Sequence, residues 1–296
     1  MCGIFGILNL DNKDINPKHL KEMSESMIFR GPDDSGELIL KNFGFGMRRL
    51  SIVDPNGECQ PISSIDNNIH IIFNGEIYNY IELRDELIKK NYTFKTNGDV
   101  EVLIHLYKDR GIKGLEEVNG MFAFALFDQE KNLLWVARDR VGIKPLFYYK
   151  DDNKFIFASD LNSINKILKK EVNLQSVIAY LGYSYIPDPK TIYKDIYKLE
   201  SASQIIIHKT NLRISKYWKI EDKNNFNGNL SDAKKKLKNH LLDSIKLQLR
   251  SDVPLGILLS GGIDSSAIAL NVRKALGNNS LQTFTANFNN KKGEDS

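Results

Sequence analysis

The sequence has only two cysteines, Cys2 and Cys59, among its 296 residues. Two cysteines build neither a disulfide framework nor a paired-cysteine metal site, and they fit a reducing compartment. No stretch approaches the roughly 18 consecutive apolar residues of a membrane-spanning helix. The first residues, MCGIFGILNLDNKD, have no basic segment before their short apolar run, which argues against a signal peptide. We therefore expect a cytoplasmic protein that does not enter a membrane.

The chain also lacks a strong excess of either charge. Its 41 Lys and Arg residues against 37 Asp and Glu give a net charge of +4, and both signs are spread along the chain. Such mixing predicts neither a nucleic-acid partner nor a membrane-surface partner. What is present is an ordinary globular composition, 42% hydrophobic and 26% charged, over a length that suits two domains.

Short β-type runs alternate with amphipathic stretches through the first two thirds of the chain. Asn16 and Pro17 mark the start of a first helix, with Leu20, Met23 and Met27 on its buried face. Density of β-branched and aromatic residues predicts strands, and apolar residues three to four apart predict helices. The expected strands are 4–8, 70–73, 121–128, 133–139, 146–149 and 155–160, and the further expected helices are 81–90 and 101–109.

Composition changes after Trp218, where the polar, Asn-rich segment EDKNNFNGNLSD follows. We interpret 219–230 as a linker between a first domain, 2–218, and a second part, 231–296. The second part opens with a predicted helix. Its apolar residues recur four apart, at Leu237, Leu241, Ile245 and Leu249. The run VPLGILLSGGIDSSAIAL then predicts a buried strand, a glycine turn and a helix start, an arrangement that binds phosphates in α/β domains.

Cys2 follows the first methionine, Met1. This methionine is commonly removed when the second residue is small, as cysteine is. Removal leaves a thiol and a free α-amino group on one residue. Free thiols have a pKa of about 8.5 and α-amines of about 7.7–8.0, so such an amine can accept the thiol proton near neutral pH. This nucleophile needs no histidine, and none of the five histidines stands in a catalytic motif that we recognise. Alone, however, a cysteine at position two is more often structural or accidental.

Six dispersed segments reverse that interpretation. They are CGIFG from Cys2, RGPDDSG from Arg30, RLSIVD from Arg49, NGEIYN from Asn74, GDVE from Gly98 and ARDRVGIKPLFY from Ala137. In order and spacing they resemble the class II glutamine amidotransferases, which use an N-terminal nucleophile. The resemblance is dense over roughly 2–160 and looser through YIPDPKTIYKDIYKL. It implies an α+β fold in which two antiparallel sheets form an αββα sandwich.

The same resemblance implies a role for each matched residue. Cys2 would attack the side-chain amide carbon of glutamine, while the Asn74 side chain and the Gly75 N–H would hold the developing oxyanion. Arg49 would bind the substrate α-carboxylate and Asp99 its α-ammonium group. The rest of the implied glutamine site is Leu50, Ser51, Ile52, Val53 and Glu76.

Asn74 and Gly75 are expected in a turn that follows the strand at 70–73. Asn-Gly is a frequent two-residue hairpin turn, and a turn can project both an amide and a free N–H. We expect the pair to serve as turn and oxyanion site together.

The remaining polar residues of the motifs are interpreted as structural. Arg30, Asp139 and Arg140 are expected to tie loops around the pocket. Cys59 is expected to be a packed or loosely exposed thiol without a catalytic role.

The segment LLSGGIDSS, 258–266, is not a Walker loop, because no lysine follows its glycines. Its backbone N–H groups and hydroxyls at a helix start can bind phosphates, and Asp264 can bind Mg²⁺ beside them. The pattern SGG-x-DSS resembles the pyrophosphate-binding loop of the ATP pyrophosphatases. ATP and Mg²⁺ are therefore expected, with no organic prosthetic group. The implied ATP-binding residues are Leu258, Ser260, Gly261, Gly262, Asp264, Ser265 and Ser266.

Together the two parts resemble the first half of the glutamine-hydrolysing asparagine synthetases. That resemblance implies an ATP-dependent ligase: aspartate is adenylated, and ammonia from glutamine converts it to asparagine with release of AMP and pyrophosphate. Its partners would be the substrates glutamine, aspartate and ATP. Whether the protein forms a homodimer is left open by the sequence. We expect a truncated chain, because about 30 residues after the loop do not complete a nucleotide-binding domain.

Three alternatives stay open. One is a related ATP-dependent amidotransferase whose acceptor is a surface sugar or a secondary metabolite. Another is a stand-alone glutaminase. The third is a non-catalytic scaffold, which the complete set of Cys2, Arg49, Asn74 and Asp99 argues against.

Overall fold

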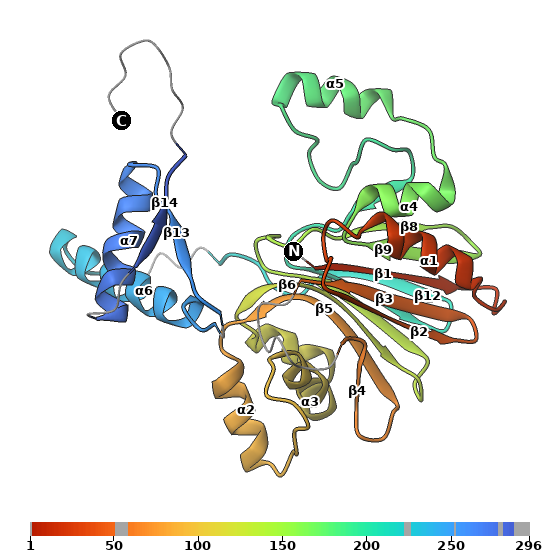
Figure 1. Ribbon diagram of the computed structural model, residues 1–296, viewed down its shortest axis with the longest axis horizontal. Helices are drawn as coiled ribbons and strands as arrows, with labels where there is room; N and C mark the ends of the chain where they lie inside the picture. Colours follow the sequence, from red (N-terminus) through yellow and green to blue (C-terminus); the bar gives the residue numbers. More distant parts are fainter. Residues whose placement is uncertain (1, 51–58, 222–225, 252, 278–280, 287–296) are drawn as a thin grey trace. The chain divides into compact units, whose positions relative to one another are not determined.

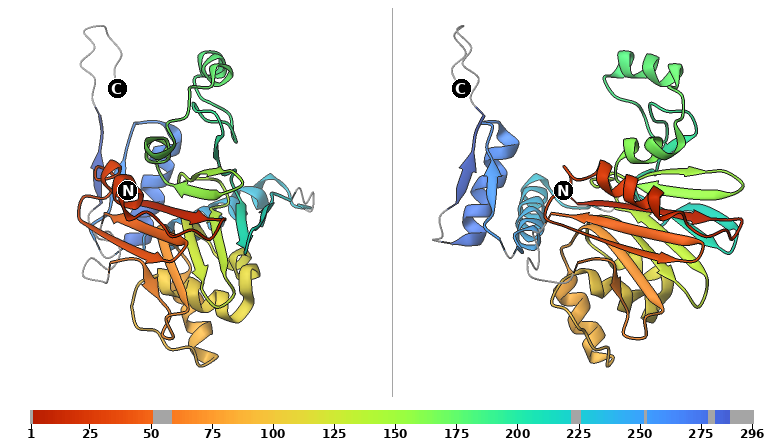
Figure 2. Two further views of the ribbon diagram at one scale, coloured as in Figure 1. Left: turned by 90° about the vertical axis from the view of Figure 1, so that its right-hand side faces the viewer. Right: turned by 45° about the vertical axis from the view of Figure 1, so that its right-hand side comes forward.

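The computed structural model describes residues 2–50, 59–221, 226–251, 253–277 and 281–286. The chain divides into two compact units, Met1–Ile220 and Glu221–Ser296. The first unit contains two six-stranded sheets and the second a two-stranded sheet. Figures 1 and 2 show the two large sheets of the first unit lying face to face.

Both large sheets are antiparallel throughout. The first has the order β10-β8-β9-β1-β3-β2, with bounds β1 Gly3–Asn9, β2 Asp34–Leu40, β3 Phe43–Arg49, β8 Phe147–Lys150, β9 Lys154–Ala158 and β10 Ile196–Lys198. The second has the order β12-β11-β7-β6-β5-β4, with bounds β4 Ile62–Ser63, β5 Ile69–Ile77, β6 Gly120–Asp128, β7 Leu133–Arg138, β11 Ser203–His208 and β12 Asn211–Lys216.

Helices cover the outer face of each sheet (Figure 1). The first sheet carries α1 Pro17–Ser26 and α4 Leu161–Leu168, and the second carries α2 Tyr80–Lys89, α3 Val100–Arg110 and the 3₁₀ helix η1 Gly111–Glu117. Three apolar layers follow from this order: one under α1 and α4, one between the sheets, and one under α2 and α3. The predicted four-layer α+β sandwich is confirmed.

Local signals in the sequence explain where α1 begins and what it buries. The Asn16 side chain accepts a hydrogen bond from the Lys18 N–H at 3.0 Å, and proline occupies the first turn, as both residue types prefer. Leu20, Met23 and Met27 are buried beneath the helix, as predicted. The other predicted helices and strands of the first unit are also present, with ends shifted by a few residues.

The predicted turn at Asn74 and Gly75 is wrong. Strand β5 continues through both residues to Ile77, and it stays paired with β6 as far as the Ile77–Gly120 pair. A hairpin turn would have ended the strand at Phe73. The long partner strand β6 instead extends the ladder, and glycine at position 75 admits the close approach of its backbone.

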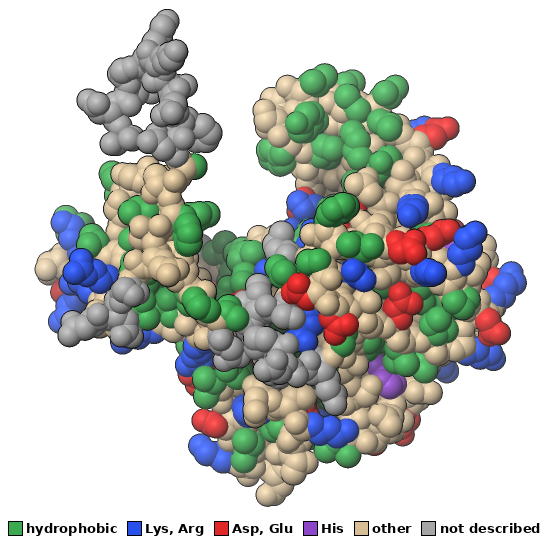
Figure 3. All heavy atoms as spheres, viewed as in Figure 1, with side chains coloured by type: hydrophobic (Ala, Val, Ile, Leu, Met, Phe, Trp, Pro, Cys, Tyr) green, Lys and Arg blue, Asp and Glu red, His purple; other side chains and the backbone are tan. Residues whose placement is uncertain are grey.

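The helix α5, Leu174–Tyr183, carries an apolar surface without a charged residue (Figure 3). Its exposed apolar side chains are Leu174, Ile178, Tyr180, Leu181 and Tyr183. This helix is only 10 residues long. Within the part of the chain that the structure describes, no helix combines the length and the hydropathy that a membrane crossing requires.

The second unit begins with the helix α6, Leu230–Gln248, followed by β13 Gly256–Leu258, α7 Ile263–Leu276 and β14 Gln282–Phe284. Asn229 and Asp232 form a capping box at the start of α6. Strands β13 and β14 are parallel with α7 between them in the chain, which is a βαβ unit. The expected burial of the strand is wrong: Leu258 is 82% exposed, and Leu255 just before the strand is 41% exposed.

Candidate active site

Cys2 precedes β1 and contacts the apolar layer between the two large sheets. Its Sγ lies 3.3 Å from the N of Leu50, which donates to it, and 3.5 Å from the carbonyl oxygen of the same residue. The Arg30 guanidinium donates to the Cys2 carbonyl oxygen through Nε at 3.3 Å and Nη2 at 3.2 Å. Backbone and sulfur are therefore both held in place at the start of β1.

Asn74 brings an amide into the same layer. Side chains alternate along β5, and Asn74 shares a face with Ile72, which belongs to the layer between the sheets. Asn74 is 1% exposed, and its Nδ2 finds no hydrogen-bond partner among the described residues. A buried donor without an acceptor costs free energy, so an acceptor supplied by a ligand would be favourable here.

The Gly75 N–H is directed away from β6. Its cross-strand partner Phe122 donates from N to the Asp139 Oδ2 at 3.2 Å and accepts at O from the Asp139 N at 2.8 Å. Both polar groups of Phe122 thus face β7, and Gly75 with Phe122 forms a non-hydrogen-bonded pair. The N–H of Gly75 consequently points to the open side of β5.

The neighbours of Gly75 along β5 show what this open side offers. The Phe73 N–H donates to Gln60 Oε1 at 2.6 Å, and the Ile77 N–H donates to Asp99 Oδ2 at 2.8 Å. Both have the same strand parity as Gly75, so the three N–H groups point the same way. Among the described residues, the Phe73 and Ile77 N–H groups have an acceptor and the Gly75 N–H has none. The Gly75 N–H is therefore available to a ligand.

Only glycine fits at position 75. Its φ is +155°, a conformation that side chains rarely adopt, and a Cβ there would lie 2.0 Å from the Met121 carbonyl oxygen. This close approach keeps β5 paired with β6 at the point where the candidate oxyanion donors lie.

Asp99 lies immediately before α3, and it makes no capping hydrogen bond to that helix. It is buried, and its carboxylate reaches the edge of β5 at Ile77. Burial raises the pKa of Asp99 to about 6, with the nearby Glu76 adding to the rise while the Ile77 N–H and Arg84 oppose it. A cationic partner bound at this carboxylate would favour its ionised form.

Glu76 and Lys144 are two oppositely charged residues that interact with each other, and Lys144 also interacts with Cys2. Burial raises the pKa of Glu76, and the Lys144 ammonium opposes that rise. Burial lowers the pKa of Lys144, and its interactions with Glu76, Cys2 and Asp139 oppose that change. Lys144 was not among the sequence-predicted site residues, although it lies in the ARDRVGIKPLFY segment whose resemblance was noted.

Asp139 fastens the loop that carries Lys144. The Asp139 carboxylate is fully buried, and it accepts from the N–H groups of Val141, Ile143 and Lys144 as well as from Phe122. It thereby joins this loop to β6 opposite Gly75.

Arg140 and Arg30, the two arginines interpreted as structural, make loop contacts. Arg140 Nη2 donates to the Glu116 carbonyl oxygen at 2.8 Å, and its guanidinium lies over the Trp218 ring. Arg30 holds the Cys2 backbone, as described above.

The RLSIVD segment is only partly described. Arg49 ends β3 and is buried, and Leu50 follows it against the Cys2 sulfur. Ser51, Ile52 and Val53 lie outside the described residues. The segment therefore brings Arg49 within one residue of the thiol contact.

Cys59 has a different environment. Its Sγ donates to the Gln60 carbonyl oxygen at 3.5 Å. Burial, together with the neighbouring Asp34 carboxylate, raises the pKa of Cys59 to about 11. Thiolate is the reactive form of cysteine, so this thiol is poorly nucleophilic at neutral pH.

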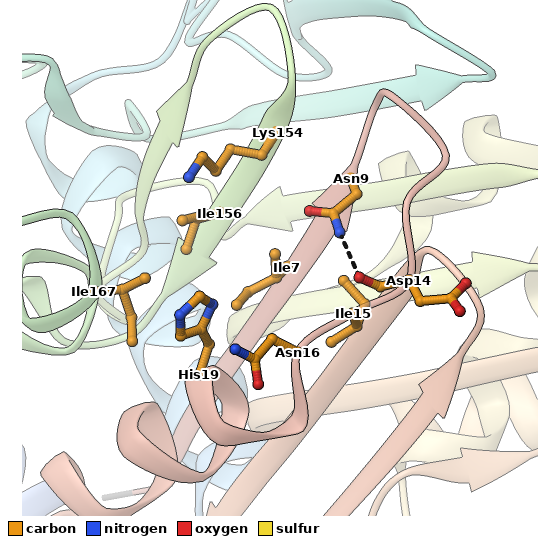
Figure 4. A pocket seen from close by; sticks show the side chains of 9 residues that line it. All are labelled: Ile7, Asn9, Asp14, Ile15, Asn16, His19, Lys154, Ile156 and Ile167. Carbon is orange, nitrogen blue, oxygen red and sulfur yellow. Dashed lines mark hydrogen bonds between the residues drawn. The ribbon is translucent and has the colours of Figure 1, made fainter.

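A cavity of about 120 Å³ opens elsewhere, between β1, α1, β9 and α4 (Figure 4). Its lining residues are Ile7, Asn9, Asp14, Ile15, Asn16, His19, Lys154, Ile156 and Ile167. Ile7 is five residues after Cys2, roughly 16 Å along a strand, and its side chain faces the helix layer. The Asn9 side chain already donates to the Lys13 and Asp14 carbonyl oxygens. This cavity is thus separate from the Cys2 site.

In the second unit, the glycine loop joins the end of β13 to the start of α7. Gly261 has φ +81°, and a Cβ there would meet nothing within 4 Å. Gly262 caps α7 without a side-chain hydrogen bond, so N–H groups of the first turn stay open to an anion. Ser265 Oγ lies 3.1 Å from both Ser260 Oγ and the Gly262 carbonyl oxygen.

The other sequence-predicted residues of this loop are placed around the same turn. Asp264 lies in the first turn of α7, Ser266 donates from N to the Gly262 carbonyl oxygen at 3.1 Å, and Leu258 ends β13. Among the residues that the structure describes, no group of three or more His, Cys, Asp or Glu side chains forms a metal site.

Each of the two parts of the chain is similar to known proteins. Residues 1–218 match the family model of the glutamine amidotransferase domain, and residues 236–296 match that of asparagine synthase. The chain is 38% identical, over 99% of its length, to the putative glutamine-hydrolysing asparagine synthetase 2 of Methanocaldococcus jannaschii. It is also 38% identical, over 97% of its length, to the glutamine-hydrolysing asparagine synthetase 1 of Bacillus subtilis. It covers 61% and 46% of these two relatives, which is about half of their length.

A solved structure shares the fold. Glutamine phosphoribosylpyrophosphate amidotransferase from B. subtilis aligns with 96% of this chain and 65% of its own, at a TM-score of 0.56 and 18% identity. At that identity the match establishes the arrangement of sheets and helices, while the site rests on the residues of this chain.

Proposed function

Since the chain belongs to the glutamine amidotransferase family, we propose that its first unit hydrolyses glutamine to glutamate and ammonia with Cys2 as nucleophile. One observation carries the proposal. The buried Asn74 amide and the Gly75 N–H both lack an acceptor among the described residues, and Asn74 faces the layer that Cys2 contacts. Two donors without an acceptor near a nucleophile are what an oxyanion site requires.

In the proposed reaction, removal of Met1 frees the α-amino group of Cys2, which accepts the thiol proton. The thiolate attacks the side-chain amide carbon of glutamine, and the carbonyl oxygen becomes an oxyanion between Asn74 Nδ2 and the Gly75 N. The tetrahedral intermediate collapses as the α-ammonium returns a proton to the leaving nitrogen, which departs as ammonia. Water then attacks the resulting thioester through the same oxyanion site, and glutamate leaves with the thiol restored.

Substrate selection is proposed to rest on two opposite charges. Asp99, buried at the edge of β5, binds the α-ammonium group, and the Arg49 guanidinium binds the α-carboxylate in the two-point geometry that suits it. Glu76 and the segment from Leu50 to Val53 complete the pocket. Together these groups favour a free amino acid over a peptide.

For the second unit we propose ATP binding at the glycine loop and transfer of the ammonia to an adenylated aspartate. The support is the asparagine synthase match of residues 236–296 and the names of the relatives. The loop fits a polyphosphate, since Gly261 adopts a turn that leaves the space beside it open and the first turn of α7 offers N–H groups. Ser260, Gly261, Gly262, Ser265 and Ser266 would hold phosphate oxygens and Leu258 would border the nucleotide. Asp264 would hold Mg²⁺, which supplies positive charge to the phosphates.

Glutamate release from glutamine tests the proposal for the first unit. The chain with Met1 removed is expected to release glutamate, and Cys2→Ala is expected to lose at least about 10³-fold in rate, because it removes the proposed nucleophile and the other thiol, Cys59, is poorly nucleophilic at neutral pH. Cys59→Ala is the matched control and should stay within about twofold of the wild type, since burial raises the pKa of the Cys59 thiol to about 11 and Cys59 has no proposed role in the reaction. Equal glutamate release from Cys2→Ala and wild type would contradict the assignment.

Formation of AMP from ATP tests the second unit. Since the chain spans about half of the length of its relatives, the test uses a protein extended to their full length, and aspartate-dependent AMP release with matching asparagine is the expected result there. This chain alone is expected to form no asparagine. If AMP release requires a different carboxylate acceptor, that acceptor replaces aspartate in the proposal. An unchanged rate in Asp264→Asn would contradict the metal-binding role of that residue.

A further inference from the structure

We propose that Arg84 of α2 and Glu101 of α3 are positioning residues that place the Asp99 carboxylate and thereby set the preference for a substrate with an α-ammonium group. The inference rests on the proposed function, because it takes Asp99 as the group that binds the ammonium. Among the described residues, neither the Arg84 nor the Glu101 side chain forms a hydrogen bond with Asp99. Both act on the segment of chain that leads to it.

Glu101 gathers the N–H groups at the start of that segment. The Lys95 N lies 2.9 Å and 3.0 Å from the two carboxylate oxygens, and the Thr96 N and Oγ1 donate to Oε2 at 2.8 Å and 2.9 Å. Burial opposes ionisation of Glu101, but the neighbouring His105 ring and the donors of Lys95 and Thr96 outweigh it and hold the pKa of Glu101 at about 2. The carboxylate is therefore charged at any physiological pH.

Arg84 gathers the carbonyl groups of the same segment. Nη1 donates to the Thr96 carbonyl oxygen at 2.8 Å, and Nη2 donates to the Gly98 carbonyl oxygen at 2.5 Å. The guanidinium carbon lies 4.4 Å from the centre of the Phe94 ring, which restricts its orientation further. Planar, two-point donation of this kind is specific to arginine.

The two side chains form a clamp on residues 95–98, which lie between α2 and α3 without regular structure. Thr96 is held from both sides, by Glu101 at its N–H and by Arg84 at its carbonyl. A Cβ at position 98 would meet nothing within 4 Å, so little packing locates Gly98. The hydrogen bonds of the clamp therefore determine where the next residue, Asp99, begins.

Asp99 is then fixed between the clamp and β5. Its Oδ2 accepts from the Ile77 N–H, two residues beyond Gly75. This places the carboxylate and the available Gly75 N–H along the same open side of one strand. Movement of the segment would change the distance between the ammonium-binding group and the oxyanion donor, while Cys2, held by Leu50 and Arg30, would stay in place.

Charge also couples Arg84 to Asp99. The charged groups that face Asp99 are Glu76 of β5, which favours its neutral form, and Arg84 of α2, which favours its ionised form. The Ile77 N–H, like Arg84, lowers the pKa of Asp99. The Glu101 carboxylate accepts hydrogen bonds from the loop N–H groups of Lys95 and Thr96. Loss of Arg84 should therefore weaken ammonium binding through both position and charge.

Selectivity between two substrates separates positioning from a general loss of structure. Glutaramate is glutamine without its α-amino group, so it reaches Cys2 and the oxyanion donors but gives Asp99 nothing to bind. A displaced Asp99 lowers kcat/KM for glutamine more than for glutaramate. A merely unstable enzyme loses active molecules and lowers both values in the same proportion.

The experiment compares the kcat/KM ratio of glutamine to glutaramate in the full chain. Arg84→Met and Glu101→Gln should lower this ratio at least about fivefold, mainly through a higher KM for glutamine. Arg84→Lys keeps the positive charge but loses the planar two-point donation, and it should give an intermediate ratio, which keeps the test valid if Arg84→Met does not fold. Lys89→Met, an exposed change at the end of the same helix, should keep the wild-type ratio.

An unchanged ratio in folded Arg84→Lys and Glu101→Gln would overturn the inference, as would an equal loss on both substrates. Failure of the proposed function gives a different result: wild type would release no glutamate, or Asp99→Asn would leave the ratio unchanged. The two failures are therefore distinguishable within one set of assays.

Discussion

The backbone N of Leu50 lies 3.3 Å from the sulfur of Cys2, although the two residues are 48 positions apart in the chain. The contact joins the start of β1 to the residue that follows β3. It places the thiol beside Arg49, which precedes Leu50 and is proposed to bind the substrate carboxylate. Nucleophile and substrate-binding residue are thus brought together by the pairing of β1 with β3.

Asn74→Ala should lower kcat for glutamine by about 10²–10³-fold, because it removes one of two proposed oxyanion donors. KM should change little, since the donor acts on charge that develops only in the transition state. Steady-state kinetics measures both values, and the rate of Cys2 alkylation by iodoacetamide serves as a control for an intact nucleophile. A large rise in KM with unchanged kcat would assign Asn74 to substrate binding instead.

The activity on glutamine should fall as pH decreases through about 6, where Asp99 becomes protonated. Burial raises the pKa of Asp99 from 3.8, so the ionised form that attracts an ammonium group is present above pH 6 and lost below it. Profiles of kcat/KM against pH report groups of the free enzyme. The limb should be present with glutamine and absent with glutaramate; the same limb with both substrates would assign it to another group.

Gly75→Ala should destabilise the first unit by at least about 2 kcal/mol, from an unfavourable φ and a clash with the Met121 carbonyl. Gly182→Ala is the matched control. Position 182 lies in α5 and a Cβ there meets nothing within 4 Å, so alanine should be neutral or stabilising by up to about 1 kcal/mol. Urea unfolding compares the two, and equal stabilities would contradict the close approach of β6.

Asp139→Asn should cost about 3 kcal/mol or more, because an amide NH₂ would face N–H groups that now donate to a carboxylate. Glutamate release should fall as well, since Asp139 fastens Phe122 opposite Gly75. Asp152→Asn, at an exposed position, provides the control and should stay within about 0.5 kcal/mol of the wild type. Unfolding in urea measures both changes, and an Asp139→Asn protein as stable as the control would contradict the role of this carboxylate.

Much of the fold was predictable because periodic burial leaves a local record in the sequence. Leu20, Met23 and Met27 mark the buried face of α1, and the aromatic run of β6 marks a strand buried on both faces. Asn74 and Gly75 were misplaced because their dipeptide favours a turn when isolated, whereas the ladder with β6 determines their conformation. Tertiary pairing overrode the local preference.

The candidate site was only partly predictable for a similar reason. Cys2, Asn74, Gly75 and Asp99 stand in motifs, and the structure places Asn74 toward the layer of Cys2 and Asp99 beside β5. Lys144 and the Arg84–Glu101 clamp were missed, since their importance comes from contacts between distant segments. An arginine on an amphipathic helix looks like an ordinary exposed charge until its carbonyl partners are known.

Mass spectrometry after reaction with a glutamine analogue that carries a diazoketone in place of the side-chain amide tests the central claim most directly. The intact protein should have lost Met1 and gained one adduct, and the modified peptide should begin at Cys2. Cys59 should stay unmodified at neutral pH, because burial raises the pKa of its thiol to about 11. An adduct on Cys59, or glutamate release that continues without any modification of Cys2, would contradict the assignment of Cys2 as the glutamine nucleophile.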